Sequence, residues 1–75
     1  MIEIGKILEE LDQLNKVANR KGHCYELTND ADAYLRLYEV SNEENPELVF
    51  ITADSELFYA YVSLLKNIFI QTANK

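Results

Sequence analysis

The spacing of the hydrophobic residues predicts a helix at the start of the chain. Apolar residues recur there every three or four positions, which is typical of one side of a helix, and this predicts a helix over residues 2–21. Its apolar stripe consists of Ile4, Ile7, Leu8, Leu11, Leu14, Val17 and Ala18, whereas Glu3, Lys6, Glu10, Gln13 and Arg20 point elsewhere. Gly22 follows a basic last turn and suits a left-handed cap.

After Gly22 the spacing changes to every second residue, which predicts strands. Three such runs cover residues 23–28, 33–40 and 48–53. The segments between them, 29–32 and 41–47, are short and rich in turn-forming residues. Connections of these lengths favour an antiparallel meander, because parallel neighbours need a longer crossover.

A second helix is predicted from a cap at Asp54 or Ser55 to about Thr72. Its inward stripe is predicted to consist of Leu57, Phe58, Tyr61, Leu64, Leu65, Ile68 and Phe69. Tyr59, Val62 and Ile70 then lie on its other sides, as apolar surface beyond what the core needs.

The predicted fold class is therefore α+β, in the order α-β-β-β-α, with a single domain over residues 1–75. Both helices are expected on one face of a three-stranded antiparallel meander, which leaves the other face open. The second strand sends Ala33, Leu35 and Leu37 toward the helices and Tyr34, Arg36, Tyr38 and Val40 away from them. In the first strand Tyr25 and Leu27 are placed inward. The third strand is apolar on both faces, so its register stays open.

Composition narrows the class of protein. The single cysteine, Cys24, has no intramolecular disulfide partner, and the first residues show no secretory leader, so a cytoplasmic protein is expected. The longest mostly apolar stretch, residues 57–70, is shorter than the roughly 20 residues that a membrane-spanning helix needs. We therefore expect no membrane partner.

No motif in the sequence predicts catalysis or a cofactor. His23 and Cys24 are neighbours, but consecutive strand residues point to opposite faces, so the imidazole cannot activate the thiol. Asp30 and Asp32 have the first spacing of a calcium loop without its glycine and distal glutamate. We expect neither an enzyme nor a bound metal or cofactor.

Charge is distributed very unevenly along the chain, whose formal charge is -6. Residues 26–56 contain nine acidic residues and one basic residue, Arg36, whereas residues 57–75 contain two bases and no acid. Such a field repels the phosphates of nucleic acids and attracts a basic protein surface. The alternative is that the acidic loops only keep the domain soluble.

In topology the predicted order resembles the double-stranded-RNA-binding domain. That family binds RNA with basic residues at the start of the second helix and between the first two strands, where this chain has residues 52–56 and 29–32. Both segments are acidic, so direct nucleic-acid binding is not expected. The order and the acidic middle are also similar to small phage anti-CRISPR proteins, which imply an inhibitor that mimics nucleic acid and occupies a basic groove.

These observations predict a non-enzymatic acidic protein that binds a partner protein with a basic surface, such as a CRISPR effector. The residues expected to bind this partner are Asp30, Asp32, Tyr34, Arg36, Tyr38, Glu43, Glu44 and Glu47. The alternative is a homodimeric structural or regulatory protein, because a small monomer is not expected to leave so much apolar surface in water.

Overall fold

The structure is a computed structural model that describes residues 2–29 and 32–73. Its elements follow the chain as α1 (Ile4–Ala18), a 3-10 turn (Asn19–Lys21), β1 (Tyr25–Thr28), β2 (Leu35–Glu39), β3 (Glu47–Thr52) and α2 (Ser55–Ala73). The predicted α+β class and α-β-β-β-α order are confirmed. The element ends differ from the predicted ones by two residues or fewer, apart from the last turn of the first helix, which is 3-10.

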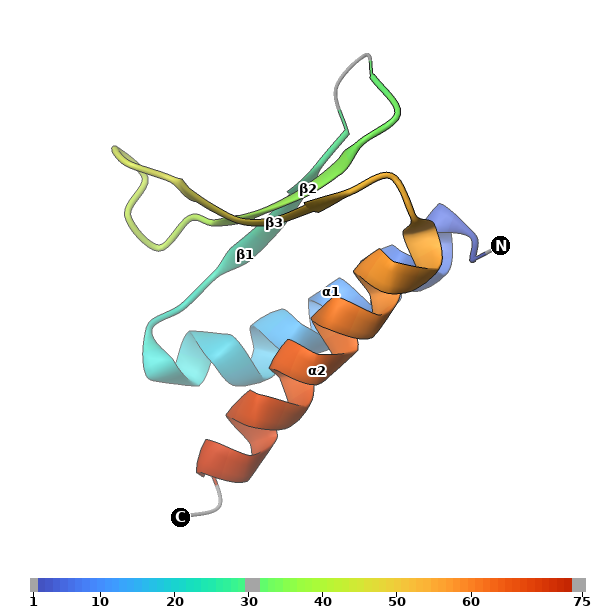
Figure 1. Cartoon of the computed structure of the whole chain (residues 1–75). Helices are drawn as coiled ribbons and strands as arrows, with labels where there is room; N and C mark the ends of the chain where they lie inside the picture. The colour runs from blue at the N-terminus through green and yellow to red at the C-terminus, as the bar shows by residue number, and fades with distance from the viewer. Residues whose placement is uncertain (1, 30–31, 74–75) are drawn as a thin grey trace.

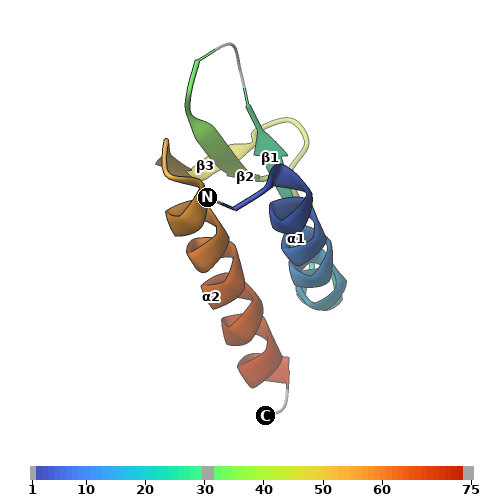
Figure 2. The same ribbon diagram turned by 90° about the vertical axis from the view of Figure 1, so that its right-hand side faces the viewer.

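The elements form two layers (Figure 1). The strands are antiparallel in the order β1-β2-β3, and both helices lie on one face of this sheet. Figure 2 shows α1 on the β1 side and α2 on the β3 side, with both helices starting at the same end of the molecule. No described helix covers the other face of the sheet. No helix of the described residues is long and apolar enough to cross a membrane.

The end of α1 and its connection to β1 are fixed by local hydrogen bonds. Gly22 has a φ of 81°, in the left-handed region that glycine tolerates best, and its N–H donates to the carbonyl of Asn19. The Asn15 side chain then joins α1 to the edge strand, since its amide donates to the carbonyl of Tyr25 at 2.9 Å and its oxygen accepts from the Tyr25 N–H at 2.8 Å. The predicted cap at Gly22 is therefore confirmed.

The core lies between the sheet and the two helices, where Ile7, Leu14, Leu37, Phe58 and Val62 are fully buried. Leu35 and Leu37 face the helices and Tyr25 and Leu27 pack against the core, as the strand alternation predicts.

The structure also settles the register of the third strand. Phe50 pairs with Leu37 and its ring stacks on Tyr61 at 4.2 Å, whereas Leu48 pairs with Tyr38. Leu37 and Tyr38 are consecutive, but their partners Phe50 and Leu48 are separated by Val49, so β3 has a bulge at Val49.

The predicted stripes of both helices were partly wrong. In α1, Ile4 and Leu8 are about half exposed, whereas Glu10 is buried. In α2 the error is larger, because Leu57, Leu64 and Ile68 are exposed and Val62, which was placed outside, is fully buried. The reason is that α2 is apolar nearly all round, so its sequence does not specify which side faces the core.

A buried ion pair sets the rotation of α2. Lys66 Nζ lies 2.8 Å from Glu10 Oε2 on α1, and it also donates to the Gln13 side chain at 3.2 Å. Burial raises the pKa of Glu10, but hydrogen bonds from Lys66 and Ser63 and the Lys66 charge outweigh it, so the pKa is lowered. Lys66 is thereby held against α1, and the side of α2 that carries Leu57, Leu64 and Ile68 faces solvent.

Candidate functional site

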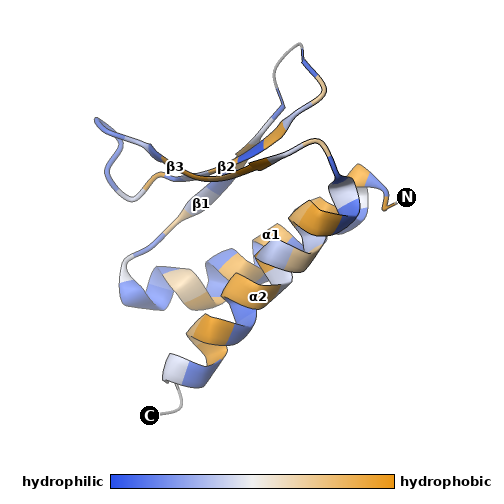
Figure 3. Cartoon of the chain, viewed as in Figure 1, coloured by the Kyte–Doolittle hydropathy of each residue, from blue (hydrophilic) through white to orange (hydrophobic). Residues whose placement is uncertain are grey.

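The candidate site is the face of the sheet that is turned away from the helices, called here the outer face. Strand pairing forms two rows of side chains on it. Thr28, Arg36 and Ile51 form one row, and Glu26, Tyr38 and Leu48 form the other. Tyr34, Leu48 and Ile51 are 43–47% exposed, so the face presents an aromatic and aliphatic surface to solvent. The loop between β2 and β3 extends beyond one end of the sheet (Figure 1). Figure 3 shows that this loop is hydrophilic.

At one end of the outer face a bidentate ion pair neutralises the only basic residue of the region. Arg36 donates to both carboxylate oxygens of Asp32, at 3.1 and 2.7 Å, and Asp32 also accepts from the Tyr34 N–H. The hydrogen bond from Arg36 is the main cause that lowers the pKa of Asp32. Arg36 therefore contributes packing and hydrogen-bonding groups to the face with little net positive charge.

At the other end, apolar side chains and one acidic side chain line a small hollow. It encloses about 200 Å³ and is lined by Glu26, Thr28, Tyr38, Val40 and Pro46. A second, larger hollow of about 560 Å³ adjoins it, because Glu26, Val40 and Pro46 also line that one, together with Glu43. Small-molecule sites usually enclose about 300–1,000 Å³, so the first hollow fits one side chain of a partner better than a cofactor.

Glu26 and Glu43 are exposed carboxylates, and within the described part of the chain neither forms an ion pair or side-chain hydrogen bond. Their charge is therefore available to an approaching cation. An arginine or lysine side chain can lay its aliphatic stem on Tyr38, Val40 and Pro46 while its charged end meets these carboxylates.

The structure brings together some of the predicted binding residues and separates others. Arg36 and Tyr38 share the outer face, Tyr34 is exposed directly before β2, and Asp32 is joined to the face through Arg36. Glu43 lines the larger hollow. The remaining three residues differ: Glu44 lies in the exposed turn beside it, Glu47 pairs with Glu39 and so lies on the other face, and Asp30 lies outside the described residues.

Sequence reasoning missed Leu48, Ile51 and Pro46 as members of this face. The apolar alternation of β3 showed that one of its faces had to be exposed, but the bulge at Val49 decides which residues occupy it. Pro46 reaches the hollow from a loop, and no periodicity predicts that.

The residues that most resemble a catalytic set are arranged for structure. His23 Nδ1 donates to Glu39 at 2.6 Å, and Ser41 donates to the same carboxylate through its N–H and its hydroxyl. The Ser41 hydroxyl therefore donates to the Glu39 carboxylate and not to the His23 imidazole, so the three side chains do not form a serine–histidine pair. The His23 ring packs against Phe69, whereas Cys24 lines the larger hollow on the outer side.

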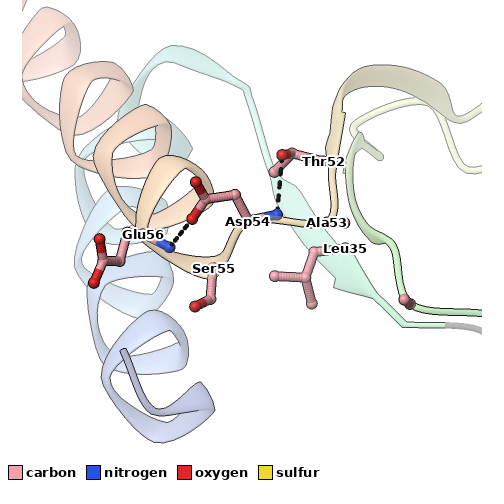
Figure 4. A pocket seen from close by; sticks show the side chains of 7 residues that line it. Leu35, Thr52, Ala53, Asp54, Ser55 and Glu56 are labelled. Atoms are coloured by element: carbon pink, nitrogen blue, oxygen red, sulfur yellow. Dashed lines mark hydrogen bonds between the residues drawn. The ribbon is translucent and has the colours of Figure 1, made fainter. Parts of the chain in front are cut away.

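A further open hollow lies beside the start of α2 (Figure 4). Asp54 caps this helix, because its carboxylate accepts from the N–H groups of Glu56 and Leu57 at 3.0 and 3.3 Å. Two acidic residues therefore occupy the positive end of the helix dipole, and an anionic ligand is disfavoured there.

The described residues contain no group of three or more His, Cys, Asp or Glu side chains that could hold a metal ion. Comparison with known proteins gives no match to a family model, to a curated protein or to a solved structure. The candidate site is therefore interpreted from its own geometry.

Proposed function

We propose that this protein is a non-enzymatic, cytoplasmic interaction protein that binds the basic surface of a partner protein through the outer face of its sheet. The observation that carries the proposal is the juxtaposition of an exposed apolar face with the carboxylates of Glu26 and Glu43. The apolar side chains supply contact area, and the carboxylates select for cations.

The two ends of the face have different roles in this proposal. Tyr34, Ile51 and Leu48 are the exposed groups that lose water on binding. The hollow beside Tyr38 takes one basic side chain of the partner. Arg36 is held by Asp32, so it does not repel the incoming positive charge.

The charge of the region also favours a class of partner. Proteins that handle nucleic acids carry basic grooves for phosphates, and a compact acidic domain competes for such a groove. A CRISPR effector is one such protein, in keeping with the resemblance to phage anti-CRISPR proteins. Direct binding to nucleic acid is disfavoured by the same charge.

The proposal is tested with a nona-arginine peptide as the basic probe, in isothermal titration calorimetry. We expect the affinity to fall about tenfold or more between about 50 mM and about 300 mM salt, because exposed charges are screened. We expect the triple variant E26Q/E43Q/E44Q to weaken binding about fivefold or more.

The matched control removes three exposed acids from the region of α1, in the variant E3Q/E9Q/D12N. It changes net charge equally but leaves the outer face intact, so its affinity is expected to stay close to that of the wild type. Equal losses in the two variants would mean that the peptide senses only net charge, and the proposed face would be wrong.

A further inference from the structure

The small hollow on the outer face brings one carboxylate next to one aromatic ring. Glu26 on β1 pairs directly with Tyr38 on β2, and the Cβ atoms of such cross-strand pairs lie about 5 Å apart on the same face of a sheet. Pro46 lines the hollow from the other side of the central strand, since it directly precedes β3. A side chain that enters the hollow can therefore contact the ring and the carboxylate together.

The outer face already holds one guanidinium, which belongs to the chain itself. Arg36 lies two residues before Tyr38 on the same strand, and it donates a forked pair of hydrogen bonds to Asp32 at 3.1 and 2.7 Å. Glu26 presents the same kind of acceptor beside Tyr38. No basic side chain in the described part of the chain forms an ion pair with Glu26. This second carboxylate is therefore free to pair with a guanidinium from another molecule.

We infer that the hollow selects an arginine of the partner over a lysine. This inference rests on the proposed function, because it specifies which basic side chain enters the hollow. A guanidinium is planar and weakly hydrated, so it can stack on the Tyr38 ring while it donates two parallel hydrogen bonds to the Glu26 carboxylate. An ammonium group is compact and strongly hydrated, and one carboxylate beside a ring replaces few of its contacts with water.

The surroundings of the hollow separate attraction from selection. The hollow encloses about 200 Å³, which suits one side chain, and the half-buried Tyr38 and Val40 offer apolar area to its aliphatic stem. Glu43 lines the adjoining larger hollow and adds negative charge, which attracts lysine and arginine equally. The preference for arginine therefore depends on the Tyr38 ring and the fork at Glu26, and not on the number of carboxylates nearby.

The test compares two peptides that differ in one side chain, nona-lysine and the same peptide with arginine at its central position. Both carry the same charge, so general attraction to the acidic surface affects them equally. Isothermal titration calorimetry at about 50 mM salt keeps this attraction strong enough to measure. We expect the single arginine to tighten binding about fivefold, through stacking and the forked hydrogen bonds.

Substitutions assign this preference to the hollow. Tyr38→Leu keeps apolar area but removes the ring, so the preference should fall below about twofold, whereas Tyr34→Leu should weaken both peptides about equally and leave the preference unchanged. Glu26→Gln removes the fork and should also reduce the preference. Its matched control is Glu43→Gln, which removes the same charge from the adjoining hollow and should weaken both peptides equally. Both glutamates are exposed, so this second pair of variants does not require the fold to tolerate a change at Tyr38.

The possible results distinguish arginine selection from the binding of basic partners in general. Equal affinities of the two peptides for the wild type would overturn arginine selection and leave the proposed function standing. A preference that persists in Glu26→Gln, or that Glu43→Gln reduces to the same extent, would also overturn it, because the arginine would then bind outside the hollow. If neither these peptides nor nona-arginine bind, the proposed function itself is wrong.

Discussion

The outer face of the sheet and the solvent-facing side of α2 are both exposed and apolar, but they differ in the charges that surround them. The residues on this side of α2, called the α2 stripe, are Leu57, Tyr61, Leu64 and Ile68. The outer face combines Tyr34 and Ile51 with an ion pair at one end and the free carboxylates of Glu26 and Glu43 at the other. The stripe carries no charge, and the one basic residue of its helix is bound to α1. Apolar area is available on both surfaces, but only the outer face carries charge that selects a partner.

The difference in charge predicts how binding at each surface depends on salt concentration. Binding at the outer face is expected to weaken as salt rises, because it depends on exposed carboxylates. A contact made through the stripe is not expected to weaken as salt rises, because the stripe carries no charge that salt could screen. The two surfaces are therefore expected to respond differently to ionic strength, although both belong to one small domain.

The largest expected effect tests whether the outer face is a surface at all. Replacing the fully buried Leu37 by alanine should lower the free energy of unfolding by about 2–5 kcal/mol, through lost burial and a residual cavity. Replacing Tyr34, 47% exposed, should cost about 1 kcal/mol or less. Urea unfolding followed by circular dichroism measures both. A larger loss for Tyr34→Ala than for the Leu37 variant would show that the buried and exposed faces of the sheet are assigned wrongly.

The next effect tests the rotation of α2, on which the stripe depends. Lys66→Met should destabilise the fold by about 2–4 kcal/mol, because it leaves the buried carboxylate of Glu10 without its partner. The double variant E10Q/K66M should recover most of this loss, since no charge is then left in the interface. If Lys66→Met has no effect, α2 is turned differently and the stripe is not the exposed side.

A smaller effect concerns the loop beside the outer-face hollow. Hydrogen bonds from His23 and Ser41 lower the pKa of Glu39 from an ordinary value of 4.5 to about 2. A lowered carboxyl pKa contributes stability that is complete above the ordinary pKa and is lost as the pH falls toward 2. We expect a loss of about 1–2 kcal/mol over this interval, reduced by solvent screening.

The measurement for Glu39 is the urea midpoint between about pH 6 and about pH 2, compared with Glu39→Gln. The wild type should lose more stability than the variant over this range. Parallel pH profiles would show that the carboxylate of Glu39 does not hold the loop.

The smallest expected effects on stability are those of two tyrosine variants, which are expected to differ in peptide binding. Tyr38→Leu and Tyr34→Leu should each change the free energy of unfolding by about 1 kcal/mol or less. Tyr38→Leu should weaken binding of the nona-arginine peptide more, because Tyr38 lines the hollow. A larger loss of binding for Tyr34→Leu would show that the partner's basic side chain binds at the other end of the face.

The parts of the fold that depend on local patterns could be predicted from the sequence. Leu35 and Leu37 alternate with polar or aromatic neighbours, so their face followed from strand geometry, and Gly22 marked the end of the first helix. The α2 rotation could not be predicted, because the exposed stripe and the inward set have the same spacing and differ by one position. The inward set is Phe58 and Val62, which are buried, with the partly buried Leu65 and Phe69.

The features that the sequence pattern did not predict depend on contacts between residues far apart in the chain. Glu10 is buried because Lys66 reaches it from the other helix, and no local pattern contains that contact. In the candidate site, Arg36 and Tyr38 lie on one side of β2, as the strand alternation predicts. The hollow depends on Glu26 from β1 and Pro46 from a loop. Glu47 does not lie on the outer face, because the bulge in β3 makes it pair with Glu39.

The most direct test of the central claim is a map of amide chemical shifts in the ¹⁵N-labelled protein during titration with the nona-arginine peptide. We expect the largest shifts at residues of the outer face and its hollow, around Glu26, Tyr38 and Val40, with small changes along the α2 stripe. Shifts concentrated on α2, or spread evenly over all acidic residues including those of α1, would contradict the proposal that the outer face selects a basic partner.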